Sequence, residues 1–334
     1  MALKLPVQMD THAWDSHPQN VHALDTHTWG SRTYVMGILN VTPDSFSGDG
    51  LMGVLSPPLS SLRASGQVPG EEESCNGYKE EEPWIASALH LARRFVSAGV
   101  DILDVGGEST RPGSQPIPLE AEISRVTPVI RALAKEFDVL ISIDTYKSAV
   151  AEAALKVGAH IVNDVWGLKA DPDLAKVAAQ YKVPVILMHN RSKTSNAQIQ
   201  ERLGGRYVGM AYENLIEDVR RELLESVTLA KSAGIPDERI ILDPGIGFGK
   251  TVEQNLELLD RLGEIRSLGY PVLCGPSRKS FIGYTLGLPP YQRLEGTAAA
   301  VAVSIARGAD IVRVHDVEFM VHVARMTDAI VRRN

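Results

Sequence analysis

Cysteine, aromatic residues and long apolar runs are all scarce in this sequence of 334 residues. Only two cysteines, Cys75 and Cys274, are present, and aromatic residues make up 6% of the chain. Two cysteines in a chain of this length cannot form the framework of a disulfide-rich secreted protein, so we expect a reducing compartment, the cytoplasm. No apolar stretch is long enough to cross a bilayer, and the first residues lack the apolar core of a signal peptide.

Positive charge is also in deficit. The chain carries 34 lysines and arginines against 41 aspartates and glutamates, which gives a formal net charge of −7. This balance argues against nonspecific nucleic-acid binding, and an anionic ligand would need a local positive cluster. The hydrophobic content of 44% is typical of a globular protein. The length suffices for one large domain with additional segments.

The first thirty residues differ from the rest of the chain. Four histidines recur there every five residues: His12, His17, His22 and His27. A metal site is one interpretation, but this spacing places the side chains on neither one helix face nor one strand face. A short hairpin or linker packed against the main domain is favoured. We therefore divide the chain into an N-terminal extension at 1–30 and a main domain at 31–334.

A second unusual segment covers residues 47–82. It is rich in Gly, Ser and Pro and carries two runs of three glutamates, at 71–73 and 80–82. Loops of this length are usually functional lids or disordered segments, and this composition favours a flexible insertion. The glutamate runs fit a solvated tract better than a ligand site.

Eight short apolar runs, each followed by polar or glycine-rich residues, alternate with stretches of helical periodicity. The runs are Tyr34–Leu39, Val100–Leu103, Val139–Ile143, Ile161–Val162, Val183–Met188, Ile240–Leu242, Val272–Cys274 and Ile311–Val312. Helices are expected from Pro83 onward and at 118–136, 147–157, 172–181, 208–233, 252–267, 293–307 and 316–331. Buried strands that alternate with helices predict an α/β fold with parallel strands. Eight units favour a closed (β/α)8 TIM barrel over an open doubly wound sheet and place the active site at the carboxyl ends of the strands.

Residues able to bind a ligand follow the first two strands. Asn40 ends the first one, and its amide oxygen is a hard ligand suited to a Mg²⁺ ion that keeps most of its waters; a turn-forming role is the alternative. After the second strand, Gly106 and Gly107 allow the backbone to approach a ligand closely. Arg111 in the same loop is a cation able to recognise a carboxylate or a phosphate.

A glycine-rich loop follows Asp243. It ends in Gly249-Lys250-Thr251, as a nucleotide-binding loop does, but Pro244 stands where that motif needs its first glycine. The dinucleotide-binding fingerprint also fails, because Lys250 takes the place of its third glycine. We interpret the segment as the wall of a pocket below Asp243.

The last two strands end in hydroxyl and basic side chains. Arg313 and His315 lie two residues apart and therefore on one strand face, a pair suited to clamping an anion. Closure of the barrel makes the first and eighth strands neighbours, so Asn40 is expected beside this pair, which favours a diphosphate. The other strand ends suit a flat heterocycle with donors and acceptors on its edges. The residues around that heterocycle are Asp144, Asn163, Asp243 and Lys279.

Seven ordered segments closely resemble the dihydropteroate synthases. They are GILNVTPDSFS (37–47), DVGGESTRPG (104–113), SIDTYKS (142–148), VGAHIVND (157–164), DPGIGFGK (243–250), GPSRKSFIG (275–283) and IVRVHDV (311–317). The resemblance spans residues 33–334. It implies a transferase of folate synthesis that condenses 6-hydroxymethyl-7,8-dihydropterin diphosphate with 4-aminobenzoate and releases diphosphate. It also implies a Mg²⁺ cofactor, a homodimer and a sulfonamide target.

The resemblance assigns roles to individual positions. Asn40 matches the magnesium ligand, and Arg313 and His315 match the diphosphate anchor. Asp144, Asn163, Asp243 and Lys279 match the pterin site, and Thr110 matches a further substrate contact. Arg111, Pro112, Phe248 and Ser277 match positions around the aminobenzoate site. Asn40, Arg313, His315 and Lys279 are the expected catalytic group.

Some features depart from the family pattern. Ser47-Gly48-Asp49-Gly50 replaces the more usual Ser-Asp-Gly-Gly, and His189, after the fifth strand, receives no role. The insertion and the Gly-Pro-Ser-Arg-Lys segment resemble eukaryotic forms, in which this domain commonly ends a multifunctional folate protein. Residues 1–30 would then be an interdomain remnant, and a mitochondrial location would become an alternative to the cytoplasm.

Two other functions stay open at this point. A methyltetrahydrofolate-dependent methyltransferase has a similar barrel, but it would not need the Arg313 and His315 pair. A non-catalytic pterin-binding protein is the other alternative, and the loss of a site residue would indicate it. No expected site residue is lost from the sequence.

Overall fold

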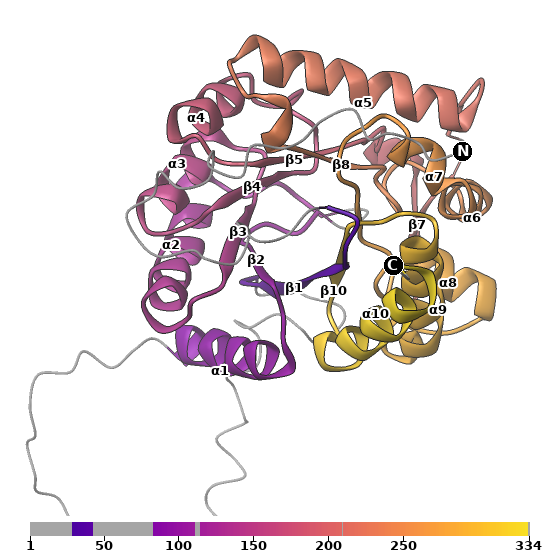
Figure 1. Ribbon diagram of the computed structural model, residues 1–334, viewed down its shortest axis with the longest axis horizontal. Helices are drawn as coiled ribbons and strands as arrows, with labels where there is room; N and C mark the ends of the chain where they lie inside the picture. Colours follow the sequence, from indigo (N-terminus) through magenta and orange to yellow (C-terminus); the bar gives the residue numbers. More distant parts are fainter. Residues whose placement is uncertain (1–28, 43–82, 111–113, 209, 333–334) are drawn as a thin grey trace, which may run out of the picture.

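The structure is a computed structural model that describes residues 29–42, 83–110, 114–208 and 210–332. Within these ranges, eight parallel strands form one ring (Figure 1). The barrel strands are β1 (Tyr34–Asn40), β2 (Ile102–Gly106), β3 (Leu140–Asp144), β4 (Ile161–Asp164), β5 (Val185–Met188), β8 (Ile240–Asp243), β9 (Leu273–Cys274) and β10 (Ile311–Val314). Their order is β8-β5-β4-β3-β2-β1-β10-β9, and a parallel bridge between Leu242 and Val272 joins the two end strands. The predicted closed barrel is confirmed.

Helices surround the ring of strands. Figure 1 shows α1 to α4 along one side, α5 across the outside of β5 and β8, and α6 to α10 along the other side. Their bounds are α1 (Pro83–Ala98), α2 (Leu119–Glu136), α3 (Ser148–Lys156), α4 (Asp173–Tyr181), α5 (Leu215–Ser232), α6 (Val252–Asp260), α7 (Leu262–Arg266), α8 (Ser280–Leu286), α9 (Leu294–Ala306) and α10 (Val317–Val331). None of the helices in the described ranges is long and apolar enough to cross a membrane.

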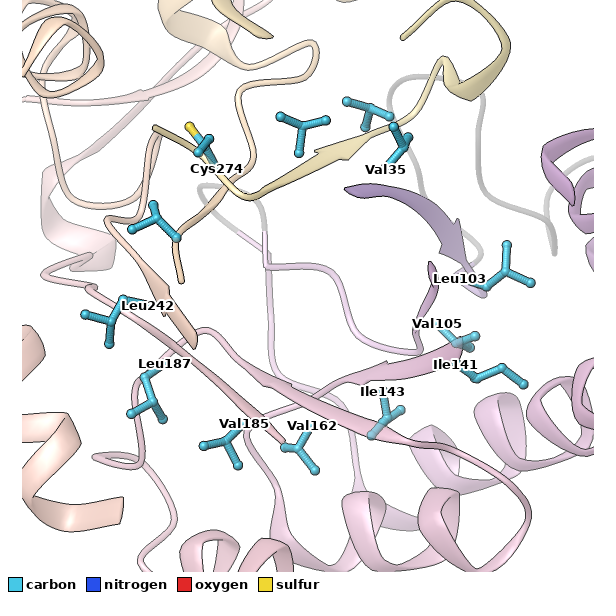
Figure 2. Close-up of a cluster of buried hydrophobic side chains, with 14 of the residues drawn as sticks. Val35, Leu103, Val105, Ile141, Ile143, Val162, Val185, Leu187, Leu242 and Cys274 are labelled. Carbon is cyan, nitrogen blue, oxygen red and sulfur yellow. The ribbon is translucent and has the colours of Figure 1, made fainter. Parts of the chain in front are cut away.

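The strands bury both of their faces. Nine apolar residues, from Tyr34 and Met36 on β1 to Ile311 on β10, fill the inside of the ring. The alternate residues, such as Val35, Leu103 and Val312, pack outward against the helices. Figure 2 shows outward-facing side chains placed around the strands, among them Val35, Leu103 and Leu242. Side chains on both faces explain the continuous apolar runs in the sequence. They also mean that every second residue at a strand end points into the mouth.

The structure departs from the sequence-based expectations at four points. The helix expected at 208–233 begins at Leu215, where Asn214 caps it by accepting a hydrogen bond from the Glu217 amide. Ahead of it, β6 (Ala197–Gln200) and β7 (Gly204–Tyr207) form an antiparallel hairpin that the periodicity did not indicate. The helix expected at 252–267 is divided at Arg261 into α6 and α7. Helix α8 was not predicted.

The bottom of the barrel is closed by Trp29. Its ring lies 5.2 Å from the ring of Tyr34, measured between centroids, and it packs against the inner apolar cluster. This residue is near the end of the expected extension, whose residues 1–28 lie outside the described ranges. The expected insertion at 47–82 lies outside them as well. The proposed division of the chain at these segments stays a prediction.

Candidate functional site

The carboxyl ends of the strands bring the expected polar residues to one mouth. The strands pair in register, so Asn40 is opposite Gly106, Gly106 opposite Asp144, and Asp144 opposite Asn163. On the far side Met188 is opposite Asp243. Side chains alternate along each strand, so residues two or four positions after an inner apolar residue also point into the ring. The inward group is Asn40, Asp104, Asp144, Asn163, Asp243, Arg313 and His315.

Arg313 lies between two carboxylates. Its Nε donates to Asp104 Oδ2 over 2.6 Å, and its Nη2 donates to Asp144 Oδ2 over 2.7 Å. Asn163 Nδ2 donates to the same Asp104 oxygen over 3.2 Å. The sequence-based division into a diphosphate side with Arg313 and a heterocycle side with Asp144 stays a prediction, to which the structure adds a direct contact between these two residues. The arginine reaches across the mouth because its side chain is long enough to span two strands, so one guanidinium contacts both aspartates.

This cluster contains hydrogen-bond acceptors that are left over. The Oδ1 atoms of Asp104 and Asp144 are buried and have no donor among the described residues. A buried acceptor without a donor is costly, so these oxygens are suited to the N–H groups of a ligand. Burial raises the pKa of Asp144 to about 7 and Asp104 adds to the shift, although Arg313 opposes it. The carboxyl group is thus able to change its charge near neutral pH.

Asp243 and Lys279 form a second charged group at the mouth. Asp243 Oδ1 accepts the Gly245 amide over 2.7 Å, and burial raises the pKa of its carboxyl. Lys279 donates to the Ile246 carbonyl, and its Nζ lies 4.5 Å from the centroid of the Phe248 ring. Burial lowers the pKa of Lys279 to about 8, while Asp243 opposes this shift. Asp243 supplies an acceptor, Lys279 a donor and Phe248 an aromatic face on this part of the mouth.

Ser277 and His315 form a pair at the ends of β9 and β10. The Ser277 oxygen lies 3.0 Å from His315 Nδ1 and accepts the His315 amide over 3.2 Å. Between Ser277 and Lys279, Arg278 has a left-handed φ of 55° and donates to Asp316 over 2.9 Å. This conformation turns the Arg278 side chain toward α10 and leaves Ser277 and Lys279 to face the site.

Asn40 lies beside Asp144 across Gly106. A Cβ built on Gly106 would be 3.8 Å from Asn40 Oδ1 and 3.6 Å from Asp144 Oδ2, so both oxygens are close to this glycine. The described ranges contain no group of three or more His, Cys, Asp or Glu side chains able to hold a metal. One neutral oxygen next to a carboxylate fits Mg²⁺, which is commonly bound by one or two protein oxygens together with waters and phosphate.

The fold and this mouth are matched by proteins of known family. Residues 71–315 match the pterin binding enzymes. The dihydropteroate synthase of Clostridium beijerinckii is 47% identical over 305 residues, a match that covers 91% of this chain and 96% of the relative. This chain belongs to the dihydropteroate synthase family. A crystal structure of the family member from Clostridium difficile, in the presence of pteroic acid, superposes with a TM-score of 0.75 at 43% identity; it covers 92% of this chain and 100% of that one.

Two further relatives bear on the finer expectations. The folic acid synthesis protein of Pneumocystis carinii is 42% identical over 89% of this chain, but the match covers 36% of that longer protein. A dihydropteroate synthase of Yersinia pestis, solved as a sulfonamide drug complex, has a TM-score of 0.73 at 37% identity; it covers 90% of this chain and 94% of that one. The relatives of this chain thus include both proteins of similar length and a longer protein, and one of them has been solved with a sulfonamide drug.

Two of the expected site residues lie outside the described ranges, and the sequence-based interpretation missed one residue of the mouth. Thr110 lies half-buried on the loop after β2, but Arg111 and Pro112 fall outside the described ranges. Asp104, which follows the second apolar run, received no role in the sequence-based interpretation, although it binds Arg313 and Asn163. The sequence does indicate a role for Asp104, because a carboxylate within an apolar strand is rarely buried without a partner. The partner itself was not readable, because Arg313 is 209 residues away along the chain.

Proposed function

We propose that this chain joins 6-hydroxymethyl-7,8-dihydropterin diphosphate to 4-aminobenzoate, forming 7,8-dihydropteroate and diphosphate. The observation that carries the proposal is the buried group of Arg313, Asp104, Asp144 and Asn163 at the mouth of a dihydropteroate synthase barrel. It combines unpaired acceptors for a heterocycle with a cation for an anion.

The pterin is proposed to lie between the aspartates and Lys279. Its amino and ring N–H groups would donate to Asp243 and to the unpaired oxygens of Asp104 and Asp144. Lys279 would donate to a ring acceptor, as it now does to the Ile246 carbonyl. Satisfying buried carboxylates with ligand N–H groups gives specificity, because an analogue without these groups leaves the oxygens unpaired.

The diphosphate is proposed to bind Arg313 and His315. Nε and Nη2 of Arg313 are used by the two aspartates, and among the described residues none accepts from Nη1. This nitrogen is suited to a phosphate oxygen. The contact with Ser277 fixes the orientation of the His315 ring and thereby of its other nitrogen. Two donors already held in place reduce the reorganisation needed when the leaving group develops charge.

Asn40 is proposed as the protein ligand of Mg²⁺, with Asp144 close by. A bound Mg²⁺ would neutralise charge on the diphosphate leaving group. The donor set fits an ion that substrate phosphate and water hold as much as the protein does.

The chain's own contribution to the reaction is positioning and electrostatic stabilisation. The dihydropterin can delocalise positive charge at its methylene carbon, so loss of diphosphate can precede attack by the amine. Arg313 and His315 would hold the departing anion, and Phe248 and Ser277 would line the aminobenzoate side. Neither a covalent enzyme intermediate nor a strong base is required, because the neutral aromatic amine is already a nucleophile.

A homodimer is proposed to form through α10. Phe319, Met326 and Ile330 are 57%, 63% and 51% exposed. Their spacing of seven and four residues puts them on one face of the helix. Large apolar side chains gathered on one exposed face are typical of an interface. The cytoplasmic location expected from the sequence stays a prediction.

The test is diphosphate release on mixing the purified chain with both substrates and Mg²⁺. We expect release that depends on both the pterin diphosphate and 4-aminobenzoate. Methyl transfer from methyltetrahydrofolate without diphosphate release would favour the methyltransferase. Tight pterin binding without either reaction would favour a non-catalytic binding protein.

A further inference from the structure

Lys250 is a buried lysine that the proposed reaction does not use, and burial lowers the pKa of its amine to about 7. The residue stands at the end of the glycine-rich loop after β8 and is 2% exposed. Nζ lies 3.0 Å from each of three acceptors, namely His189 Nδ1, the Gly245 carbonyl and the Phe248 carbonyl. An ammonium group has three N–H donors, so this site uses all of them. In the described part of the chain, no carboxylate forms an ion pair with Lys250.

His189 connects this lysine to a carboxylate on α5. Its Nε2 lies 3.1 Å from Glu222 Oε2. Because Nδ1 accepts from Lys250, the proton of the neutral ring must be on Nε2, which donates to Glu222. Burial and the nearby Lys250 lower the pKa of His189 to about 3, so the ring is neutral at physiological pH. Arg191 in turn holds Glu222, with its Nε 3.0 Å from Oε1.

The loops after β5 and β8 pack closely at this point. A Cβ on Gly245 would lie 1.9 Å from the His189 carbonyl oxygen, and a Cβ on Gly249 would lie 2.5 Å from the Arg191 carbonyl carbon. Both glycines have a positive φ, of 73° and 57°. Only glycine permits this approach of backbone to backbone. The loop after β8 is therefore fixed on one side by the loop after β5.

The same loop meets the proposed site on its other side. The Ile246 carbonyl accepts from Lys279, and the Phe248 ring lies against the Lys279 ammonium. Asp243 is held separately, because its carbonyl accepts the His189 amide over 2.9 Å and its strand pairs with β5. A change in the loop would thus move Phe248, which the loop carries, more than Asp243 on β8 or Lys279 at the start of α8.

We propose that Lys250 is a positioning residue, which uses the chain Glu222–His189–Lys250 to hold Phe248 in the geometry that 4-aminobenzoate requires. The proposal rests on the proposed function and goes beyond it, since it gives a role to His189 and to the lysine of the glycine-rich loop. Capture of the diphosphate by Arg313 and His315 does not depend on this chain of contacts.

The test compares the two Michaelis constants in the full-length enzyme. Lys250→Met keeps the length of the side chain and removes its donors. We expect the KM for 4-aminobenzoate to rise by at least about tenfold, while the KM for the pterin diphosphate changes by less than about threefold. Lys176→Met, which changes an exposed lysine on α4 (75% exposed side chain), is the matched control and should change neither constant.

Two substitutions at His189 provide an independent comparison if Lys250→Met folds poorly. His189→Gln keeps an acceptor for Lys250 and a donor for Glu222, so both Michaelis constants should stay near those of the wild type. His189→Leu removes both bonds and should reproduce the rise for 4-aminobenzoate. The two losses should not add in Lys250→Met/His189→Leu, because both break the same chain of contacts.

An equal rise in both constants, or a loss of turnover with both constants unchanged, would overturn the positioning role. A wild-type enzyme that releases no diphosphate would instead refute the proposed function, so the two failures are distinguishable.

Discussion

The guanidinium of Arg313, bound to the buried Asp104 and the partly buried Asp144, sets the character of the mouth. Taking charges out of water is costly, and the pairing compensates only when the geometry is good, as it is here at 2.6 and 2.7 Å. Removing one partner of such a group typically costs about 3–5 kcal/mol, because the other charge stays buried. The protein thus keeps a costly polar group at the mouth, where the proposed substrate presents both N–H donors and an anion.

The sequence was enough to predict which residues line the mouth, but it did not predict which of them contact one another. The ends of the apolar runs pointed correctly to Asn40, Asp144 and Asp243 as residues of one mouth. The sequence could not show that Arg313 is shared with Asp104, because that depends on how far an arginine reaches across the barrel. His189 received no role for a similar reason, since its partner Glu222 lies on α5.

Replacing His189 tests the neutral state of that ring. The folded-state pKa of His189, about 3, lies below the usual histidine pKa of 6.5, so between these values the unfolded chain binds more protons than the folded chain. The stability from the neutral ring is therefore complete above pH 6.5 and is lost as the pH falls. His189→Gln does not titrate. We expect the free energy of unfolding of the wild type, relative to this variant, to fall by up to about 1.4 kcal/mol per pH unit below pH 6.5.

Urea unfolding of both proteins between pH 7 and pH 4.5 measures this difference. Parallel stability curves over that range would mean that His189 is not held neutral by its surroundings.

At the scale of elements, the loops after β5 and after β9 are joined by one arginine. Arg293 precedes α9 and is buried, with donors to the carbonyls of Leu203, Arg278 and Leu288 at 2.9, 2.9 and 3.1 Å. Leu203 belongs to the turn of the β6–β7 hairpin, and Arg278 lies between Ser277 and Lys279. The hairpin is therefore attached to the turn that carries two of the expected site residues.

Arg293→Gln should destabilise the protein strongly. A shorter side chain cannot reach all three carbonyls, and each buried carbonyl left without a donor costs about 1–3 kcal/mol. We expect a loss of roughly 3 kcal/mol in the free energy of unfolding. Arg307→Gln, at a half-exposed arginine that ends α9, is the control and should lose less than about 1 kcal/mol. Similar losses for the two variants in chemical denaturation would rule out the structural role of Arg293.

Helices with a clear apolar period were located well from the sequence, and irregular segments were not. The interior of α2, α3, α4 and α10 agrees with the expected ranges to within about one residue at each end. The β6–β7 hairpin was missed because its strands are mostly exposed and carry no apolar alternation. Their position comes from contacts with Tyr284, Arg293 and Gly287, which are distant in the sequence.

For the whole molecule, the number of strands decided the fold. Eight runs separated by helices predicted a closed barrel, and the bridge between Leu242 and Val272 confirms the closure. Closure has a functional consequence, because it places β10 beside β1 and lets residues from six strands meet in one mouth. The prediction that Asn40 lies beside the eighth strand of the barrel requires only that the barrel is closed.

The apolar face of α10 predicts a dimer. Phe319→Glu/Met326→Glu places two charges at the centre of that face, where burial in an interface would be strongly unfavourable. We expect the wild type to sediment as a dimer and the double variant as a monomer. Ile199→Glu, at a residue that is 71% exposed on β6, should leave the dimer intact. A monomeric wild type, or a double variant that stays dimeric, would contradict this interface.

The central claim is that Arg313 serves the diphosphate while the aspartates serve the pterin, and one binding measurement tests it directly. Calorimetry would compare the affinities of wild type and Arg313→Lys for 6-hydroxymethylpterin and for its diphosphate, without 4-aminobenzoate, after unfolding curves show that the variant is folded. Lysine keeps a positive charge near Asp104 and Asp144 but cannot bind two carboxylates and an anion together. The account predicts that affinity for the diphosphate falls by at least about tenfold and that affinity for the bare pterin changes by less than about threefold. An equal loss for both ligands would contradict it.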